Sequence, residues 1–125
     1  MELREGMEFS KEFQTGIEHS ARNIGSGDVE VLSTPSLILF IENTAREPLD
    51  SAVGNERVSV GTLINIKHFK ASRIGERVTV RVRLLSIDGN RYTFWADAFS
   101  NGKKIASGLH ERTVVIRSEF ISSIK

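Results

Sequence analysis

The second half of the chain predicts a series of antiparallel strands, and this pattern limits the fold more than any other feature. Residues 77–85 alternate between apolar and polar side chains, which is the period of a half-buried strand. Comparable segments are residues 58–69, 91–100 and 104–117. The turn signals Asp88-Gly89-Asn90 and Asn101-Gly102 separate the last three strands and predict short connections between neighbours.

A long apolar helix is predicted to precede these strands, beginning at Ser33-Thr34-Pro35. A hydroxyl side chain at or beside the N-cap, followed by proline in the first turn, is typical of a helix start. Residues 37–41 are apolar on every side, so we expect the helix to be buried all round, and Pro48 is expected to end it. One buried helix followed by antiparallel strands predicts an α+β fold, in which the sheet wraps around one long central helix.

The N-terminal part of the chain has a weaker pattern. Met7, Phe9 and Phe13 lie at even spacing, which favours a first strand within residues 3–15, and residues 16–28 are expected to form a short turn or loop. No repeat or linker interrupts the 125 residues, and 39% of them are hydrophobic, which is enough for one core. We therefore expect a single domain over residues 1–125.

The composition argues against several classes of function. Seventeen basic and sixteen acidic residues give a net charge of +1 with no basic tract, so no nucleic-acid partner is expected. The chain has no cysteine, and its three histidines lack the tight spacing of metal ligands, so we expect no disulfide, thiolate nucleophile or metal site. The N-terminus is charged and the longest apolar run, residues 37–41, is too short for a bilayer, so we expect a cytoplasmic protein with no membrane partner.

Four groups of residues resemble the motifs of one known family. They are Val31-Leu32-Ser33-Thr34-Pro35-Ser36-Leu37 followed by Glu42, Val60-Gly61-Thr62 before Lys67-His68, Gly75-Glu76-Arg77-Val78, and Gly108-Leu109-His110-Glu111-Arg112. In order and spacing, with eight positions from Thr34 to Glu42 and twenty-six from Glu42 to His68, they resemble the hotdog-fold thioesterases related to fluoroacetyl-CoA thioesterase over about residues 5–120. The resemblance implies a hotdog fold, a homodimer, an acyl-CoA substrate and no cofactor.

The resemblance also implies roles for individual residues. Thr34, Glu42 and His68 match the catalytic threonine, glutamate and histidine of that family, and Gly61 and Arg112 match two further positions, expected to be substrate-binding. Thioester hydrolysis needs a nucleophile or an activated water, a group that moves protons, and donors for the oxyanion. In an apolar helix, the pKa of Glu42 is expected to be raised, as suits a general base or a carboxylate nucleophile. His68 is expected to move protons near neutral pH, while Thr34 orients water or substrate, or attacks once a base has removed its proton.

Two departures from the family pattern affect the expected substrate. Ser72-Arg73 stands where many relatives have Thr-Pro, and Gly25 and Asp28 fall about where the fluoroacetyl enzyme has aromatic lid residues. We therefore expect an acyl-CoA thioesterase acting on a short or modest-sized acyl group, and not specifically on fluoroacetyl-CoA. The alternatives are a non-catalytic acyl-CoA binding or sensing domain, and a hotdog hydratase or dehydratase, although the Asp…His signature of those enzymes is not recognisable.

The spacing on the helix fits the dimer that the resemblance implies. Eight residues at about 1.5 Å rise place Thr34 and Glu42 roughly 12 Å apart along the axis, which is too far for a hydrogen bond. A two-fold interface with antiparallel helices would bring Thr34 of one chain beside Glu42 of the other. We therefore expect two composite active sites at the interface of a homodimer.

Each of these residues also has an ordinary structural interpretation. The alternatives are a helix cap for Thr34, an ion pair with Arg46 for Glu42, a backbone-bonded ring for His68, a strand bulge or a close backbone approach for Gly61, and an outward-facing charge for Arg112. His110 and Glu111 are expected to be solvated or structural. A further basic group could attract the phosphates of coenzyme A, namely Arg81, Arg83, Arg91, Lys103 and Lys104.

Overall fold

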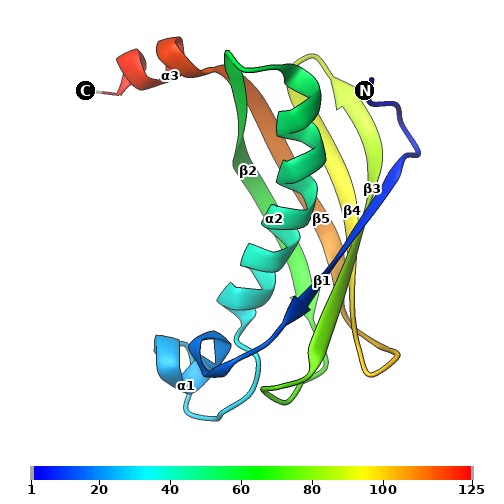
Figure 1. The fold of residues 1–125 in the computed structure, drawn as a ribbon, viewed down its shortest axis with the longest axis vertical. Coiled ribbons are helices and arrows are strands. Elements are labelled where there is room, and N and C mark those ends of the chain that lie inside the picture. Colours follow the sequence, from blue (N-terminus) through cyan, green and yellow to red (C-terminus); the bar gives the residue numbers. More distant parts are fainter. Residues whose placement is uncertain (1, 125) are drawn as a thin grey trace.

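The computed structural model describes residues 2–124 and contains one long helix packed against a five-stranded antiparallel sheet (Figure 1). The elements are β1 (Glu8–Gln14), the 3₁₀ turn η1 (Ile17–His19), α1 (Ala21–Ile24), α2 (Thr34–Val53), β2 (Arg57–His68), β3 (Arg77–Asp88), β4 (Arg91–Ser100), β5 (Lys103–Ile116) and α3 (Arg117–Ser123). The strand order is β1-β3-β4-β5-β2, so that β1 and β2 form the two edges. The predicted α+β architecture, a sheet curved around one central helix, is confirmed.

Helix α2 begins where the sequence predicts it. Ser33 is the N-cap, and its Oγ accepts a hydrogen bond of 3.1 Å from the backbone N–H of Ser36. The expectation that Pro48 ends the helix is wrong, because α2 continues to Val53. Proline removes one backbone hydrogen bond from a helix, but Leu49, the next residue, is fully buried, and its packing compensates for that loss.

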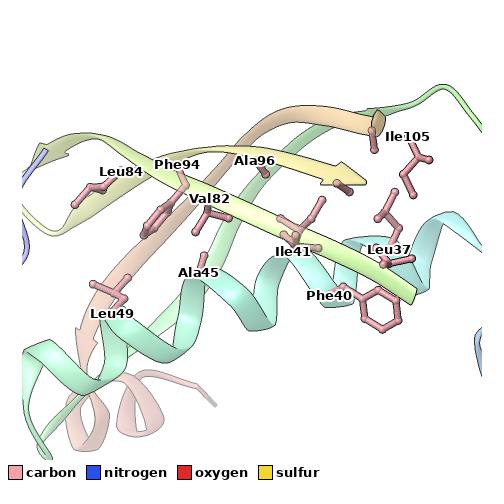
Figure 2. Close-up of a cluster of buried hydrophobic side chains, with 14 of the residues drawn as sticks. Leu37, Phe40, Ile41, Ala45, Leu49, Val82, Leu84, Phe94, Ala96 and Ile105 are labelled. Atoms are coloured by element: carbon pink, nitrogen blue, oxygen red, sulfur yellow. The ribbon is translucent and has the colours of Figure 1, made fainter. Parts of the chain in front are cut away.

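The core lies between the inner face of α2 and the concave face of the sheet (Figure 2). Its largest contributors are Leu37, Phe40, Ile41, Ala45 and Leu49 of α2, Val78, Val80, Val82 and Leu84 of β3, Phe94 and Ala96 of β4, and Ile105 and Ala106 of β5. The two-residue alternation of β3 is therefore confirmed. The predicted first strand is also present as β1, where the Phe13 ring stacks on Phe40 with centroids 4.3 Å apart.

Only one side of α2 is buried, so the prediction of a helix buried all round is wrong for the single chain. Leu39 on the opposite side is 58% exposed. The adjacent edge strand β2 also presents apolar side chains, with Leu63 44% and Ile64 40% exposed. A sheet covers one face of a helix, so nothing within residues 2–124 covers the second face of α2 or the free edge of β2, where Ile64 faces α2 and Leu63 faces the opposite side of the sheet.

Two segments contain more helix than the sequence indicates. Residues 16–28, expected as a turn or loop, include η1 and α1, and Ser20 caps α1 by accepting a hydrogen bond from the N–H of Asn23. At the other end, β5 stops at Ile116 and the chain continues as α3, which projects beyond the sheet in Figure 1. Within the described part of the chain, none of the helices has the length and apolar character needed to cross a bilayer.

Candidate active site

Thr34 and His68 form a hydrogen-bonded pair. Thr34 is the first residue of α2 and His68 is the last residue of β2, so these two element ends lie together. The distance between Thr34 Oγ1 and His68 Nδ1 is 2.9 Å. Because Ser33 makes the cap hydrogen bond, the Thr34 hydroxyl is free for this contact, and the cap interpretation of Thr34 is wrong.

The imidazole of His68 is held neutral and has one unused nitrogen. Burial is the main cause that lowers the pKa of His68 below its ordinary value of 6.5, against a smaller opposing effect of the Lys70 backbone. Nε2 is buried and has no hydrogen-bond partner among residues 2–124. A buried polar atom normally has a partner, so an unpartnered one beside a pocket marks a position where a ligand or water can bind.

A pocket of about 290 Å³ adjoins this pair. The start of α2, the end of β2 and the loop after α1 enclose it, and its lining includes Thr34, His68, Leu32 and Phe69. A larger cavity of about 400 Å³ lies beside α3, but it contains none of the predicted site residues. No cluster of histidine, aspartate and glutamate within residues 2–124 has the arrangement of a metal site.

Glu42 forms a second cluster about two turns further along α2. Its Oε2 lies 3.4 Å from Arg112 Nη1 and packs directly against Gly61 of β2. A side chain at position 61 would overlap the carboxylate, because a Cβ there would meet Oε2. The pairing of β2 with β5 also shifts between Gly61 and Leu63, so the bulge and the close approach considered for Gly61 both occur.

The surroundings of Glu42 differ from those expected in an apolar helix. Its side chain is 37% exposed and lies beside a guanidinium, so it is not in a dry apolar environment. The alternative ion pair with Arg46 is also absent, because Arg46 Nε lies 3.0 Å from Asp50 Oδ2 instead. Glu42 lies at the border of the buried face of α2, because it contacts Gly61 and Arg112 of the sheet while part of its side chain stays exposed.

Arg112 is buried, with 4% of its surface exposed, so the outward-facing interpretation is wrong. Its Nε donates to Ser59 Oγ at 2.8 Å and its Nη2 donates to Ser59 O at 3.1 Å. His110 beside it is completely buried, with Nε2 3.2 Å from Arg112 Nη1. The even-numbered residues of β5 from Ala106 to Val114 all face inward, so the strand alternation was a signal that could have identified both side chains.

The structure therefore separates the five predicted site residues into two groups. Thr34 and His68 contact each other, and Glu42, Gly61 and Arg112 contact one another. No hydrogen bond within residues 2–124 joins Glu42 to Thr34 or to His68. This agrees with the expectation that Thr34 and Glu42 are too far apart to meet within one chain.

The basic residues considered for coenzyme A are dispersed. Arg81 lies over the Phe99 ring, Arg91 pairs with Asp88 at 2.9 Å and Lys104 pairs with Asp97 at 3.2 Å. Lys103, from this group, lines a groove of about 240 Å³ together with Lys70, Arg73 and one carboxylate, that of Glu76. This groove adjoins the pocket at His68, because both share Lys70 and Ala71.

Stability is expected to fall as the pH is lowered from about 7.5 to about 5.5. Burial lowers the pKa of both His68 and His110, so the unfolded chain, with its ordinary pKa of 6.5, binds protons before the folded chain does. Protonation therefore favours unfolding as the pH falls through 6.5. Melting temperatures across this range test it, and the slope should be smaller for His68→Gln. A melting temperature that is constant or rises on acidification would contradict the assignment.

Comparisons with known proteins identify the family of this chain. Residues 17–118 match the family model described as fluoroacetyl-CoA-specific thioesterase. The fluoroacetyl-CoA thioesterase of Streptantibioticus cattleyicolor is 34% identical over 67 residues, which are 54% of this chain and 48% of that protein, so the match spans about half of the relative's length.

Solved structures extend the similarity to almost the whole chain. A structure of the fluoroacetyl-CoA thioesterase FlK matches with a TM-score of 0.92 and 25% identity, covering 99% of this chain and 96% of that one. A hot-dog-like protein from Thermanaerovibrio acidaminovorans matches with a TM-score of 0.87 and 24% identity, covering 95% and 88%. The hotdog fold expected from the resemblance is thereby confirmed. The chain therefore belongs to the family of fluoroacetyl-CoA-specific thioesterases, which are thioester hydrolases.

Proposed function

We propose that this protein is a cytoplasmic, homodimeric acyl-CoA thioesterase that hydrolyses a short or modest-sized acyl thioester to the free acid and coenzyme A. The observation that carries the proposal is the Thr34–His68 pair, which lies at a pocket with its buried Nε2 unused. One solved structure of a FlK variant is described as a complex with fluoroacetate and CoA, which supports a CoA thioester as the substrate class.

A second copy of the chain completes the site in this proposal. Gly61, against which Glu42 packs, and His68 lie on the same edge strand, and both face α2. If β2 pairs antiparallel with β2 of a second copy about an axis at Asn65, Gly61 stands opposite His68 of the partner subunit, because Thr62 is the extra residue of the bulge. Glu42 of one chain then meets the Thr34–His68 pair of the other.

The apolar surface supports the same axis. Ile64 stands opposite the buried His110 across β2 and β5, so it faces the α2 side, and it adjoins the proposed axis. Leu39 of α2 is exposed on the uncovered side of the helix. A long edge strand with exposed apolar residues is a site for strand pairing, and a partner would cover both side chains.

The chemistry follows from the side chains that meet. In one route, water adds to the thioester carbonyl carbon and loses a proton to Glu42, the C–S bond breaks, and neutral His68 accepts that proton and gives it to the departing thiolate. In the other, the Glu42 carboxylate adds to the carbonyl carbon and the C–S bond breaks to leave a mixed anhydride, which water then hydrolyses, and His68 passes the proton of that water to the thiolate. Thr34 orients the water or the acyl group. Gly61 packs against Glu42, and Arg112 contacts it through Nη1. This proposal assigns both residues to substrate binding.

The acyl group is proposed to be small and not specifically fluoroacetyl. The pocket of about 290 Å³ is at the lower end of the range for ligand sites. Gly25 ends α1 and Asp28 is exposed in the following loop, so neither supplies an aromatic ring to the pocket.

Thiol release from a panel of acyl-CoA esters tests this function. Short, branched, aromatic and long acyl groups should be compared with fluoroacetyl-CoA, using Glu42→Gln as the inactive control. Turnover of short esters without preference for fluoroacetyl-CoA is expected. Binding of acyl-CoA with no thiol release from any ester would instead favour a sensing domain, and water addition to an enoyl-CoA would favour a hydratase.

The phosphates of coenzyme A are proposed to bind in the groove of Lys70, Arg73 and Lys103, which adjoins the pocket. Replacing Lys70 and Arg73 together by glutamine is expected to raise KM for acyl-CoA about tenfold. The same variant should leave kcat/KM unchanged for the acyl thioester of N-acetylcysteamine, which has no phosphates.

The matched control is the loss of a cation outside the groove. Arg83→Gln removes an exposed positive charge from β3 and should leave KM for acyl-CoA unchanged. Equal changes for acyl-CoA and the phosphate-free thioester would refute the assignment of this groove.

A further inference from the structure

We propose that Asp50, Ser59 and His110 are positioning residues that hold Arg112 in a loose, one-sided contact with Glu42, so that the carboxylate stays free to act on the substrate. This inference rests on the proposed thioesterase function, and it concerns residues to which the family resemblance assigns no role. It follows from the directions of the hydrogen bonds around Arg112.

Ser59 is fixed by Asp50. Asp50 Oδ1 accepts hydrogen bonds from Ser59 N at 2.9 Å and from Ser59 Oγ at 2.6 Å. An ionised carboxylate only accepts, so the proton of the Ser59 hydroxyl must point to Asp50. The lone pairs of Ser59 Oγ are then available to accept from Arg112 Nε at 2.8 Å. A residue of α2 thereby sets the orientation of an acceptor on β2.

His110 is fixed from the opposite direction. Arginine has five N–H donors and no acceptor, so His110 Nε2 must accept from Arg112 Nη1. The proton of the ring is therefore on Nδ1, which donates to the backbone oxygen of Leu63 at 2.9 Å. Burial, the largest cause, lowers the pKa of His110 and favours the neutral ring that this arrangement requires.

The contact with Glu42 is the weakest of the Arg112 contacts. Arg112 uses Nε and Nη2 on Ser59 and Nη1 on His110, which leaves a single long contact of 3.4 Å from Nη1 to Glu42 Oε2. A free arginine beside a carboxylate typically forms two bonds of about 2.7–2.9 Å. The three positioning residues therefore hold the guanidinium back from the carboxylate, which limits how far Arg112 stabilises the anionic form of Glu42.

The other charged residues near Arg112 make none of these hydrogen bonds to Glu42. Arg46 and Asp50 approach from α2, and Glu111 lies beside His110 on β5, while β2 contributes the uncharged Ser59 and Gly61. Glu42 is the carboxylate within hydrogen-bond distance of Nη1. If Ser59 Oγ is removed, the guanidinium can rotate toward Glu42 and pair with it more closely.

The test compares the pH profile of kcat for wild type and Ser59→Ala. The variant is expected to have a kcat about tenfold lower, an almost unchanged KM, and an acid limb shifted to lower pH, because a closer Arg112 favours the ionised and less basic Glu42. Ser59→Thr, which keeps the hydroxyl, should restore both values. Asp50→Ala, which frees the Ser59 hydroxyl, should shift the limb in the same direction.

Controls separate positioning from loss of structure. Ser107→Ala removes a half-buried hydroxyl from β5 that makes no hydrogen bond within the described residues, and it should leave the profile unchanged. If Ser59→Ala folds but the acidic side of its pH profile is unshifted, or if only KM or the melting temperature changes, the inference is overturned. The proposed function would still stand in that case, provided that the wild type turns over acyl-CoA. No turnover by wild type on any acyl-CoA would overturn both.

Discussion

Mixing Glu42→Gln chains with His68→Ala chains is expected to restore about a quarter of wild-type turnover, although each variant alone should lose about 10³-fold. The physical reason is that the two residues lie in separate clusters within one chain and meet only across the proposed two-fold axis. In a mixed dimer, one site contains both substitutions and the other contains neither. Random exchange makes about half of the dimers mixed, and each of these has one intact site of two. Thiol release after co-refolding measures the recovery.

A second mixture tests which residues of one active site come from the same chain. Thr34 and His68 contact each other within one chain, so chains with Thr34→Ala and chains with His68→Ala are expected to give no recovery when mixed. Every site in such a mixture has a damaged Thr34–His68 pair. No recovery in the Glu42→Gln and His68→Ala mixture, with subunit exchange demonstrated by two different tags, would refute composite sites.

The alternation of apolar and polar residues was sufficient to predict which side chains of a strand are buried. Val78, Val80, Val82 and Leu84 are all fully buried, as the alternation of β3 predicts. The end of α2 could not be predicted in the same way, because the effect of Pro48 depends on packing against a sheet formed later in the chain. Helix α3 has no buried residue, and its apolar side chains Phe120 and Ile121 are exposed, so packing against the core of this chain does not explain the helix.

The candidate site was only partly accessible from the sequence. Spacing identified Thr34 and His68, but their contact depends on the end of β2 lying beside the first turn of α2, which is a tertiary fact. The dry environment expected for Glu42 assumed that an apolar helix is covered on all sides, and the exposed Leu39 shows that the single chain leaves one side open. His110 was expected to be solvated or structural, and its inward position on β5 decides between the two, because the side chain is fully buried.

Gly61→Ala is expected to lower kcat about 100-fold with little change in melting temperature. The backbone at Gly61 does not have the positive φ that would require glycine, so alanine fits the strand conformation. The added methyl group would overlap Glu42 Oε2 and lies only 3.5 Å from Arg112 Nη1, so the carboxylate must move. A displacement of about 1 Å at a reacting group is enough for a loss of this size. Steady-state kinetics and thermal melting measure the two effects separately.

A double-mutant comparison shows whether the loss acts through Glu42. If the methyl group works by displacing the carboxylate, Gly61→Ala should cost almost nothing in a chain that already carries Glu42→Gln, because the displaced group no longer contributes. Additive losses would mean that Gly61 acts independently, for example by presenting its backbone N–H to the substrate. The glycine and the glutamate come from the same chain, so the effect of Gly61 on Glu42 should also be present in the intact site of a mixed dimer. The local packing around Glu42 is thereby linked to the dimer that completes the active site.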